Sequence, residues 1–314
     1  MSGDESSRGR IEQWMNVATN IVAPTTLLGA LLFYFGYVSS RAQYAYFGVD
    51  VDTIGLNTQD YIMRSPQPLL VPLLVLPLAG AALLLADMAV RNRILRAHED
   101  DNAKGANVLR RITRSSAACG LVVLFAGVAL LFIYPYISDW PLYGLVTPLM
   151  LASGAGLVAY ASHLQRQIQD ATRRASGTQD QLPRADRLVS IPWAAKVLIY
   201  ALIAASIFWA AATVAQWSGR GLAKSEAQHL DRLPSVILDT KERLWLRDPG
   251  IEETTLLPSE GQTFHYRYRH FRLLIQGHNE MFLIPDTWSA SDSTLIVPLD
   301  SSVRVQFQFQ NDPP

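Results

Sequence analysis

Long apolar runs separated by charged connections dominate the first two thirds of the chain. The runs cover residues 21–38, 67–90, 117–137, 144–163 and 191–217. A bilayer core about 30 Å thick is spanned by roughly 20 apolar residues in a helix, because each residue adds about 1.5 Å. Buried helices of water-soluble proteins are usually shorter and carry a polar stripe. The pattern therefore predicts five transmembrane helices within residues 21–217, after a short segment of residues 1–20.

The first run also admits a second interpretation, a cleaved signal peptide. Its apolar core exceeds the usual length of about 7–15 residues. The nearest small-residue cleavage site, Val38-Ser39-Ser40, is a poor match. We therefore expect a helix that is retained in the mature protein.

Beyond Trp217 the continuous apolar runs end, and apolar and polar residues begin to alternate as they do in a β-strand. Residues 303–310 read VRVQFQFQ, with apolar residues at odd positions. Two hairpins are predicted: TLIVPL turning through residues 300–302 into VRVQFQ, and FRLLIQ turning through residues 277–279 into EMFLIP. A helix over residues 221–233 is expected to lead into a small antiparallel sheet, sandwich or partial barrel. The fold class is thus a helical membrane bundle with a C-terminal β-rich domain, residues 218–314, α+β overall.

The connection between the first two runs, residues 39–66, is too apolar for a simple tether. Aromatic and aliphatic residues alternate with Asp50, Asp52 and Asp60, and either Asn57 or Thr58 is suited to cap a short helix. We expect this segment to pack across the outer mouth of the bundle or to lie in the membrane interface. The alternative is a re-entrant loop that lines a pore.

Basic residues indicate how the helices are oriented in the membrane. Residues 91–116 hold seven Lys and Arg and residues 164–190 hold five, whereas residues 39–66 hold two and residues 138–142 none. Positive charge accumulates on the cytoplasmic side of short connections. We therefore expect a multi-pass protein of the cell membrane, with its amino terminus in the cytoplasm and its carboxyl terminus outside.

Charge and cysteine content exclude several kinds of partner and site. The chain has 27 basic and 27 acidic residues, and residues 219–314 carry ten basic and thirteen acidic groups, which disfavours nucleic acid. Cys119 is the sole cysteine, so neither an internal disulfide nor a cysteine zinc cluster can form. We expect no cofactor and no metal.

The catalytic motifs of common hydrolases, metalloproteases and nucleotide-binding enzymes are absent from the sequence. Residues 154–159, GAGLVA, match a degenerate dinucleotide fingerprint, but they lie inside an apolar run with no preceding strand. Small residues there, and at Gly120 and Gly127, instead favour close approach between membrane helices. No catalytic residue is therefore assigned.

Two ionisable residues fall within apolar runs. Asp87 lies near the cytoplasmic end of the second run and Lys196 near the cytoplasmic start of the fifth. Charge in lipid is costly, so the two residues are expected either to form an ion pair or to extend separately to the interface.

The most conspicuous polar motif outside the apolar runs is His265-Tyr-Arg-Tyr-Arg-His270. On a strand, His265, Arg267 and Arg269 face one way, and Tyr266, Tyr268 and His270 face the other. The basic face suits anionic headgroups, an envelope polymer or an acidic peptide. The alternative is an edge strand that its charges protect from pairing.

These features predict a non-enzymatic scaffold, sensor or assembly subunit whose outer domain binds a protein partner or an envelope ligand. The bilayer is the other expected partner, and a homo-oligomer is compatible with the pattern. The alternative function is a homo-oligomeric channel or transporter subunit, which is disfavoured because the apolar runs contain few polar residues and no charge near the midplane.

Overall fold

The structure is a computed structural model that describes residues 22–100, 102–137, 139–176, 192–289 and 291–308. Contacts divide the chain into two compact units. One unit combines the residues up to Leu70 with those from Ala215 onward, and the other comprises Val71–Val214. The segment before the second membrane helix therefore belongs with the C-terminal domain. The predicted boundary between a membrane domain and an outer domain separates residues expected in lipid from residues expected in water, and it stays a prediction.

The unit Val71–Val214 is built from long helices. They are α5 (Pro66–Asp100), α6 (Asn102–Ile137), α7 (Tyr143–Ser176) and α8 (Trp193–Gln228), of which α5 and α8 extend into the other unit. The stretches Pro66–Val90, Thr113–Ile137, Tyr143–Arg166 and Trp193–Gln228 are long and apolar enough to cross a membrane. Four of the predicted membrane helices are therefore present.

The exposure of these helices indicates which solvent surrounds them. Only 6% of the apolar window in α5 is buried, and Leu73, Leu78 and Leu83 are between 64% and 72% exposed. In water this apolar surface would cost about 25 cal/mol per Å². Such exposed apolar surface suits a lipid bilayer rather than water.

The first apolar run forms most of α2 (Ala23–Tyr46). Within the described residues, α2 is not among the helices that are long and apolar enough to span a membrane. Its first half is nevertheless apolar and open to solvent, with Leu27 and Leu28 more than half exposed. The fifth transmembrane helix stays a prediction.

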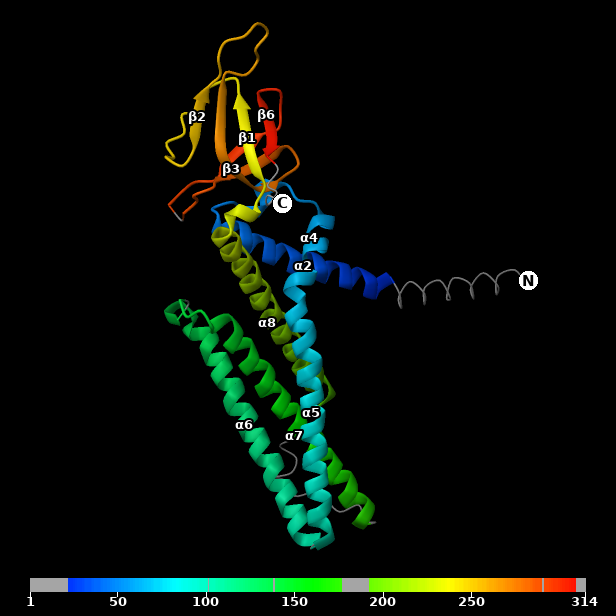
Figure 1. Ribbon diagram of the computed structural model, residues 1–314. Coiled ribbons are helices and arrows are strands. Elements are labelled where there is room, and N and C mark those ends of the chain that lie inside the picture. Colours follow the sequence, from blue (N-terminus) through cyan, green and yellow to red (C-terminus); the bar gives the residue numbers. More distant parts are fainter. Residues whose placement is uncertain (1–21, 101, 138, 177–191, 290, 309–314) are drawn as a thin grey trace, which may run out of the picture. The chain divides into compact units, whose positions relative to one another are not determined.

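Helices α6 and α7 pack closely side by side through small residues (Figure 1). A Cβ atom placed on Gly154 would lie 2.6 Å from the backbone nitrogen of Leu124, and one on Gly120 would lie 3.0 Å from that of Val158. Gly127 meets the side chain of Leu151 in the same way. The predicted role of Gly120 and Gly127 in close helix approach is confirmed, and Gly154 shares it.

The other unit contains one antiparallel sheet (Figure 1). Its strands are β1 (Ser235–Thr240), β2 (Glu252–Thr255), β3 (Tyr266–Gln276), β4 (Glu280–Pro285), β5 (Leu295–Pro298) and β6 (Val303–Gln308). Their order is β5-β4-β3-β1-β6, and β2 pairs with the first half of β3. The predicted β-rich domain is confirmed as this sheet. The 3-10 helix η3 (Leu230–Arg232) connects α8 to β1.

One of the two predicted hairpins is confirmed and the other is wrong. Strands β3 and β4 pair around residues 277–279 as expected. In contrast, β5 pairs with β4 and β6 pairs with β1, so β5 and β6 lie at opposite ends of the sheet. Residues 299–302 therefore connect the first and last strands of the sheet order and do not join two paired strands.

The packing of α6 on α7 gives a first prediction. We expect Gly154→Val to destabilise the unit Val71–Val214 by about 1–3 kcal/mol, because the new side chain collides with backbone rather than with a flexible side chain. Gly156→Val is the matched control, since nothing lies within 4 Å of its Cβ position. Thermal unfolding in detergent measures both; equal melting temperatures for the two variants would contradict the close packing.

Candidate functional site

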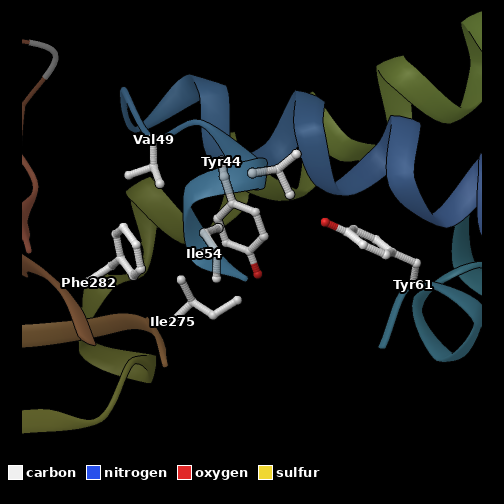
Figure 2. Close-up of a cluster of buried hydrophobic side chains, with 7 residues drawn as sticks. Tyr44, Val49, Ile54, Tyr61, Ile275 and Phe282 are labelled. Carbon is white, nitrogen blue, oxygen red and sulfur yellow. The ribbon is translucent and has the colours of Figure 1, made fainter. Parts of the chain in front are cut away.

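One face of the sheet packs on the segment that follows α2. This segment contains the short helices α3 (Val51–Ile54) and α4 (Thr58–Arg64). Its side chains meet Ile275 of β3 and Phe282 of β4 in one buried cluster (Figure 2). The cluster consists of Tyr44, Val49, Val51, Ile54, Tyr61, Ile275 and Phe282. The segment therefore forms part of the core beneath the sheet, which the sequence did not predict.

Local capping explains why the segment turns twice within a short stretch. The Asp50 side chain accepts a hydrogen bond from the backbone nitrogen of Asp52 at the start of α3, and Gly55 ends α3 with a φ of 72°. Asn57 and Asp60 then form a reciprocal capping box at the start of α4. The predicted cap at Asn57 is confirmed. These caps aim Val51 and Ile54 at the sheet.

Two glycines allow the backbone to approach closely at this interface. A Cβ atom on Gly277, in the β3–β4 turn, would collide with the carbonyl oxygen of Ile54. One on Gly36 of α2 would collide with the carbonyl oxygen of Tyr61. Any side chain at either position would force the segment away from the sheet or from α2.

The last turns of α8 reach the same face of the sheet. Ala223 of α8, Phe47 and Ile284 of β4 form a second buried cluster, and the ring of Trp288 lies 4.9 Å from that of Phe47. The Thr294 hydroxyl donates a hydrogen bond of 2.7 Å to the carbonyl oxygen of Phe47. The sheet is thus held by the end of α2 and by the end of α8 together.

Polar contacts tie α2, α4 and α8 to one another below the sheet. The Gln43 amide nitrogen lies 2.9 Å from both carboxylate oxygens of Glu226 and donates to them. The Arg64 guanidinium donates to the Tyr44 hydroxyl at 2.5 Å. We call these contacts, together with the close approach of Gly219 to the Ser39 carbonyl, the junction. Its residues are Ser39, Gln43, Tyr44, Arg64, Gly219 and Glu226.

Farther along the strands, the face that packs on the helices carries a buried carboxylate. Asp239 of β1 is fully buried and lies directly opposite Arg267 of β3 and Arg304 of β6. Arg267 donates to Asp239 from Nε at 2.8 Å and Nη2 at 3.1 Å, and Arg304 donates from Nε at 3.0 Å and Nη2 at 2.5 Å. Burial alone would raise the pKa of Asp239, but the hydrogen bonds and charges of the two arginines outweigh it and lower this pKa. We call these three residues the arginine clamp.

Of the residues predicted to form a ligand surface, Arg267 belongs to the arginine clamp, while the binding of a ligand there stays a prediction. Tyr268 is fully buried, while His265 and Arg269 are exposed and Arg267 retains 24% side-chain exposure. The alternation along this stretch is therefore as predicted. The interpretation of the motif as an edge strand is wrong, because β3 pairs with β1 on one side and with β2 and β4 on the other.

The alternation breaks at His270. This residue has a φ of 70° and lies between Arg269, where pairing with β2 ends, and Phe271, where pairing with β4 begins. Its side chain is 52% exposed, with Nδ1 3.0 Å from Asp286 Oδ2 and Nε2 3.6 Å from Glu252 Oε2. His270 therefore lies outside the core, not with Tyr266 and Tyr268 as the alternation predicts.

In the unit Val71–Val214, Asp87 accepts a hydrogen bond of 3.0 Å from the Tyr160 hydroxyl of α7. Sequence reasoning missed Tyr160, because nothing in the linear pattern indicates that α5 and α7 meet at this depth. Lys196 lies in the first turn of α8, where its backbone nitrogen bonds to the Pro192 carbonyl. The Asp87–Lys196 ion pair stays a prediction.

Neither a metal-binding group nor a similar protein indicates the function. Within the described ranges, no group of three or more His, Cys, Asp or Glu side chains is placed to hold a metal ion. No family model, curated protein or solved structure matches the chain. The candidate functional features are therefore the junction and the basic face around the arginine clamp.

The junction gives a second prediction. We expect Gly219→Ala to weaken the docking of α2 on α8 by about 1–3 kcal/mol, because the added methyl group meets the Ser39 backbone. Gly221→Ala, two residues along the same helix with no atom within 4 Å of its Cβ position, is the control. Hydrogen exchange of the β3 and β4 amides measures the effect, and unchanged protection in Gly219→Ala would show that the junction does not support the sheet.

The arginine clamp gives a third prediction, about acid stability. Because the pKa of Asp239 is lowered in the folded protein, its stabilisation is complete above the ordinary aspartate pKa, near pH 4, and is lost as pH falls through the folded pKa. We expect Asp239→Asn to lower the free energy of unfolding at pH 7 by about 2–3 kcal/mol. This loss is smaller than that expected on breaking a fully buried ion pair, because the Arg304 side chain is 48% exposed.

The difference in stability between wild type and Asp239→Asn should shrink as the pH falls below about 4. Glu260→Gln, at an exposed position, is the control and should leave the melting curve unchanged. A difference that stays constant from neutral to acid pH would rule out the ionised clamp.

Proposed function

We propose that the chain is a non-enzymatic subunit of the cell membrane, a scaffold, sensor or assembly factor, whose β-rich domain binds a partner outside the cytoplasm. The bilayer holds the four apolar helices, and the predicted fifth span lies at the start of α2. In this proposal the two predicted basic connections, residues 91–116 and 164–190, face the cytoplasm. Part of the second connection lies outside the described residues.

The observation that carries this proposal is the attachment of the sheet to the end of α8. Helix α8 runs without a break from Trp193 to Gln228, so a single helix carries both the membrane stretch and the docked end. The docked end is buried, since Ala223 is 0% exposed and Glu226 is bonded to Gln43. A subunit that only tethers a domain needs no such contacts, whereas one that positions a domain, or transmits its movement, does.

The basic face of the sheet supports partner binding through this domain. Arg269 and His265 are exposed, and Arg304 keeps 48% of its side chain accessible. The single charge of Asp239 balances only one of the two clamp arginines, so the arginine clamp retains a net positive charge. An anionic group on a protein or envelope polymer fits this face best.

A single-cysteine variant tests both the placement and the binding, and is our fourth prediction. In a Cys119→Ser background, we expect Arg269→Cys to react in intact cells with a membrane-impermeant maleimide that carries a photo-crosslinker. Illumination should then link this position to a discrete protein or polymer. Arg111→Cys, exposed on α6 in a predicted cytoplasmic connection, is the matched control and should react only after lysis.

Reaction at Arg111→Cys in intact cells, with none at Arg269→Cys, would reverse the proposed orientation. Labelling at Arg269→Cys without any crosslinked product would reject partner binding through this face. Purified protein that passes ions in liposomes would favour the alternative of a channel or transporter over a scaffold.

A further inference from the structure

Among the described strands, three have one side without a neighbour: β2, β5 and β6. Such sides expose backbone N–H and C=O groups, and proteins protect them with charges, prolines or short strands. Strand β2 carries Glu252 and Glu253, and β5 has four residues and ends at Pro298. Both are therefore protected from pairing with a further strand.

Strand β6 lacks this protection. It is six residues long, contains no proline or acidic residue, and its sole charge, Arg304, is bonded to Asp239. Since β6 pairs with β1 on one side, alternate residues direct their backbone groups to the other side. Among the strands that the structure describes, none pairs with that side.

The core beneath β6 is also incompletely covered. Val305 and Phe307 lie opposite Leu238 and Val236 of β1, on the face where those two residues are fully buried. Phe307 is 58% exposed, although it belongs to the same apolar row. An added strand with apolar residues on this face would complete the core.

The opposite face of β6 shows which polar residues such a strand should carry. Arg304, Gln306 and Gln308 alternate there, and Arg304 shares Asp239 with Arg267, so one positive charge remains beside the open side. Acidic side chains complement this charge and basic ones oppose it.

We propose that β6 accepts an extended segment of another polypeptide as an added antiparallel strand, with apolar residues over Val305 and Phe307 and acidic residues beside Arg304. The mode is strand addition to an open sheet edge, in which main-chain hydrogen bonds provide affinity and alternate side chains provide selectivity. This inference rests on the proposed function, since it names the surface and the chemistry of the partner.

The fifth prediction tests the inference with a synthetic probe. The probe is a fluorescent peptide of about eight residues that alternates Val and Glu, a length that matches a typical strand. One twin has N-methylated backbone amides, and a second twin has Lys in place of Glu. Binding to the purified full chain in lipid nanodiscs is followed by fluorescence anisotropy.

We expect saturable binding of the Glu peptide, with at least about tenfold weaker binding of both twins, because one lacks main-chain donors and the other reverses the charge. Phe307→Lys should weaken binding of the Glu peptide by about tenfold or more, since it places a charge in the apolar row. Ile296→Lys is the matched control, because Ile296 is 49% exposed on the protected strand β5, and it should change binding by less than about twofold.

Strand addition at β6 would be overturned if the Glu peptide did not bind, or if its N-methylated twin bound equally well. It would also be overturned if Ile296→Lys weakened binding as much as Phe307→Lys. A dimer of the purified chain that Phe307→Lys dissociates would show that a second copy occupies the edge, and would also overturn it. If crosslinks from Arg269→Cys persist in these cases, only this inference is lost and the proposed function stands.

Discussion

The contact between the post-α2 segment and the sheet is the interaction on which the unit of the C-terminal sheet depends. Ile54 and Phe282 are both almost completely buried, and both belong to the cluster between the segment and the sheet. Removing this contact would expose an apolar sheet face and leave α3 and α4 without support. Full burial of one such side chain contributes about 1.5–3 kcal/mol, which is offset in part by the conformational entropy lost on ordering the chain. The C-terminal sheet is thus completed by residues from the start of the chain.

The features that the sequence predicts correctly are those with a local physical signal. A run of about 20 apolar residues favours one long helix, which explains why α5 to α8 each contain a stretch long and apolar enough to span a membrane. The cap at Asn57 likewise depends on residues within one helical turn. The glycines between α6 and α7 are recognised by their small size alone. The partner of a strand is not a local property, so alternation identified β5 and β6 as strands but gave the wrong pairing between them.

The candidate site shows the same division. Period-two alternation placed His265, Arg267 and Arg269 on one face, whereas their neighbours depend on pairing between distant segments. The role of Asp239 at the centre of the arginine clamp follows from the register of β1 with β3 and β6, which the sequence pattern does not define. Gln43 and Glu226 meet across 183 positions, and no linear pattern indicates that contact. The bulge at His270 interrupts a strand without glycine or proline to mark it.

The position of Ile54 early in the chain and of Phe282 near its end has a consequence for biosynthesis. At about 5–20 residues per second, the ribosome makes Phe282 about 10–45 s after Ile54. During this interval the apolar side chains of α3 and α4 have no sheet to cover them, while the intervening helices enter the bilayer. Nascent chains that stall before β4 should therefore be the most prone to aggregate and to be degraded.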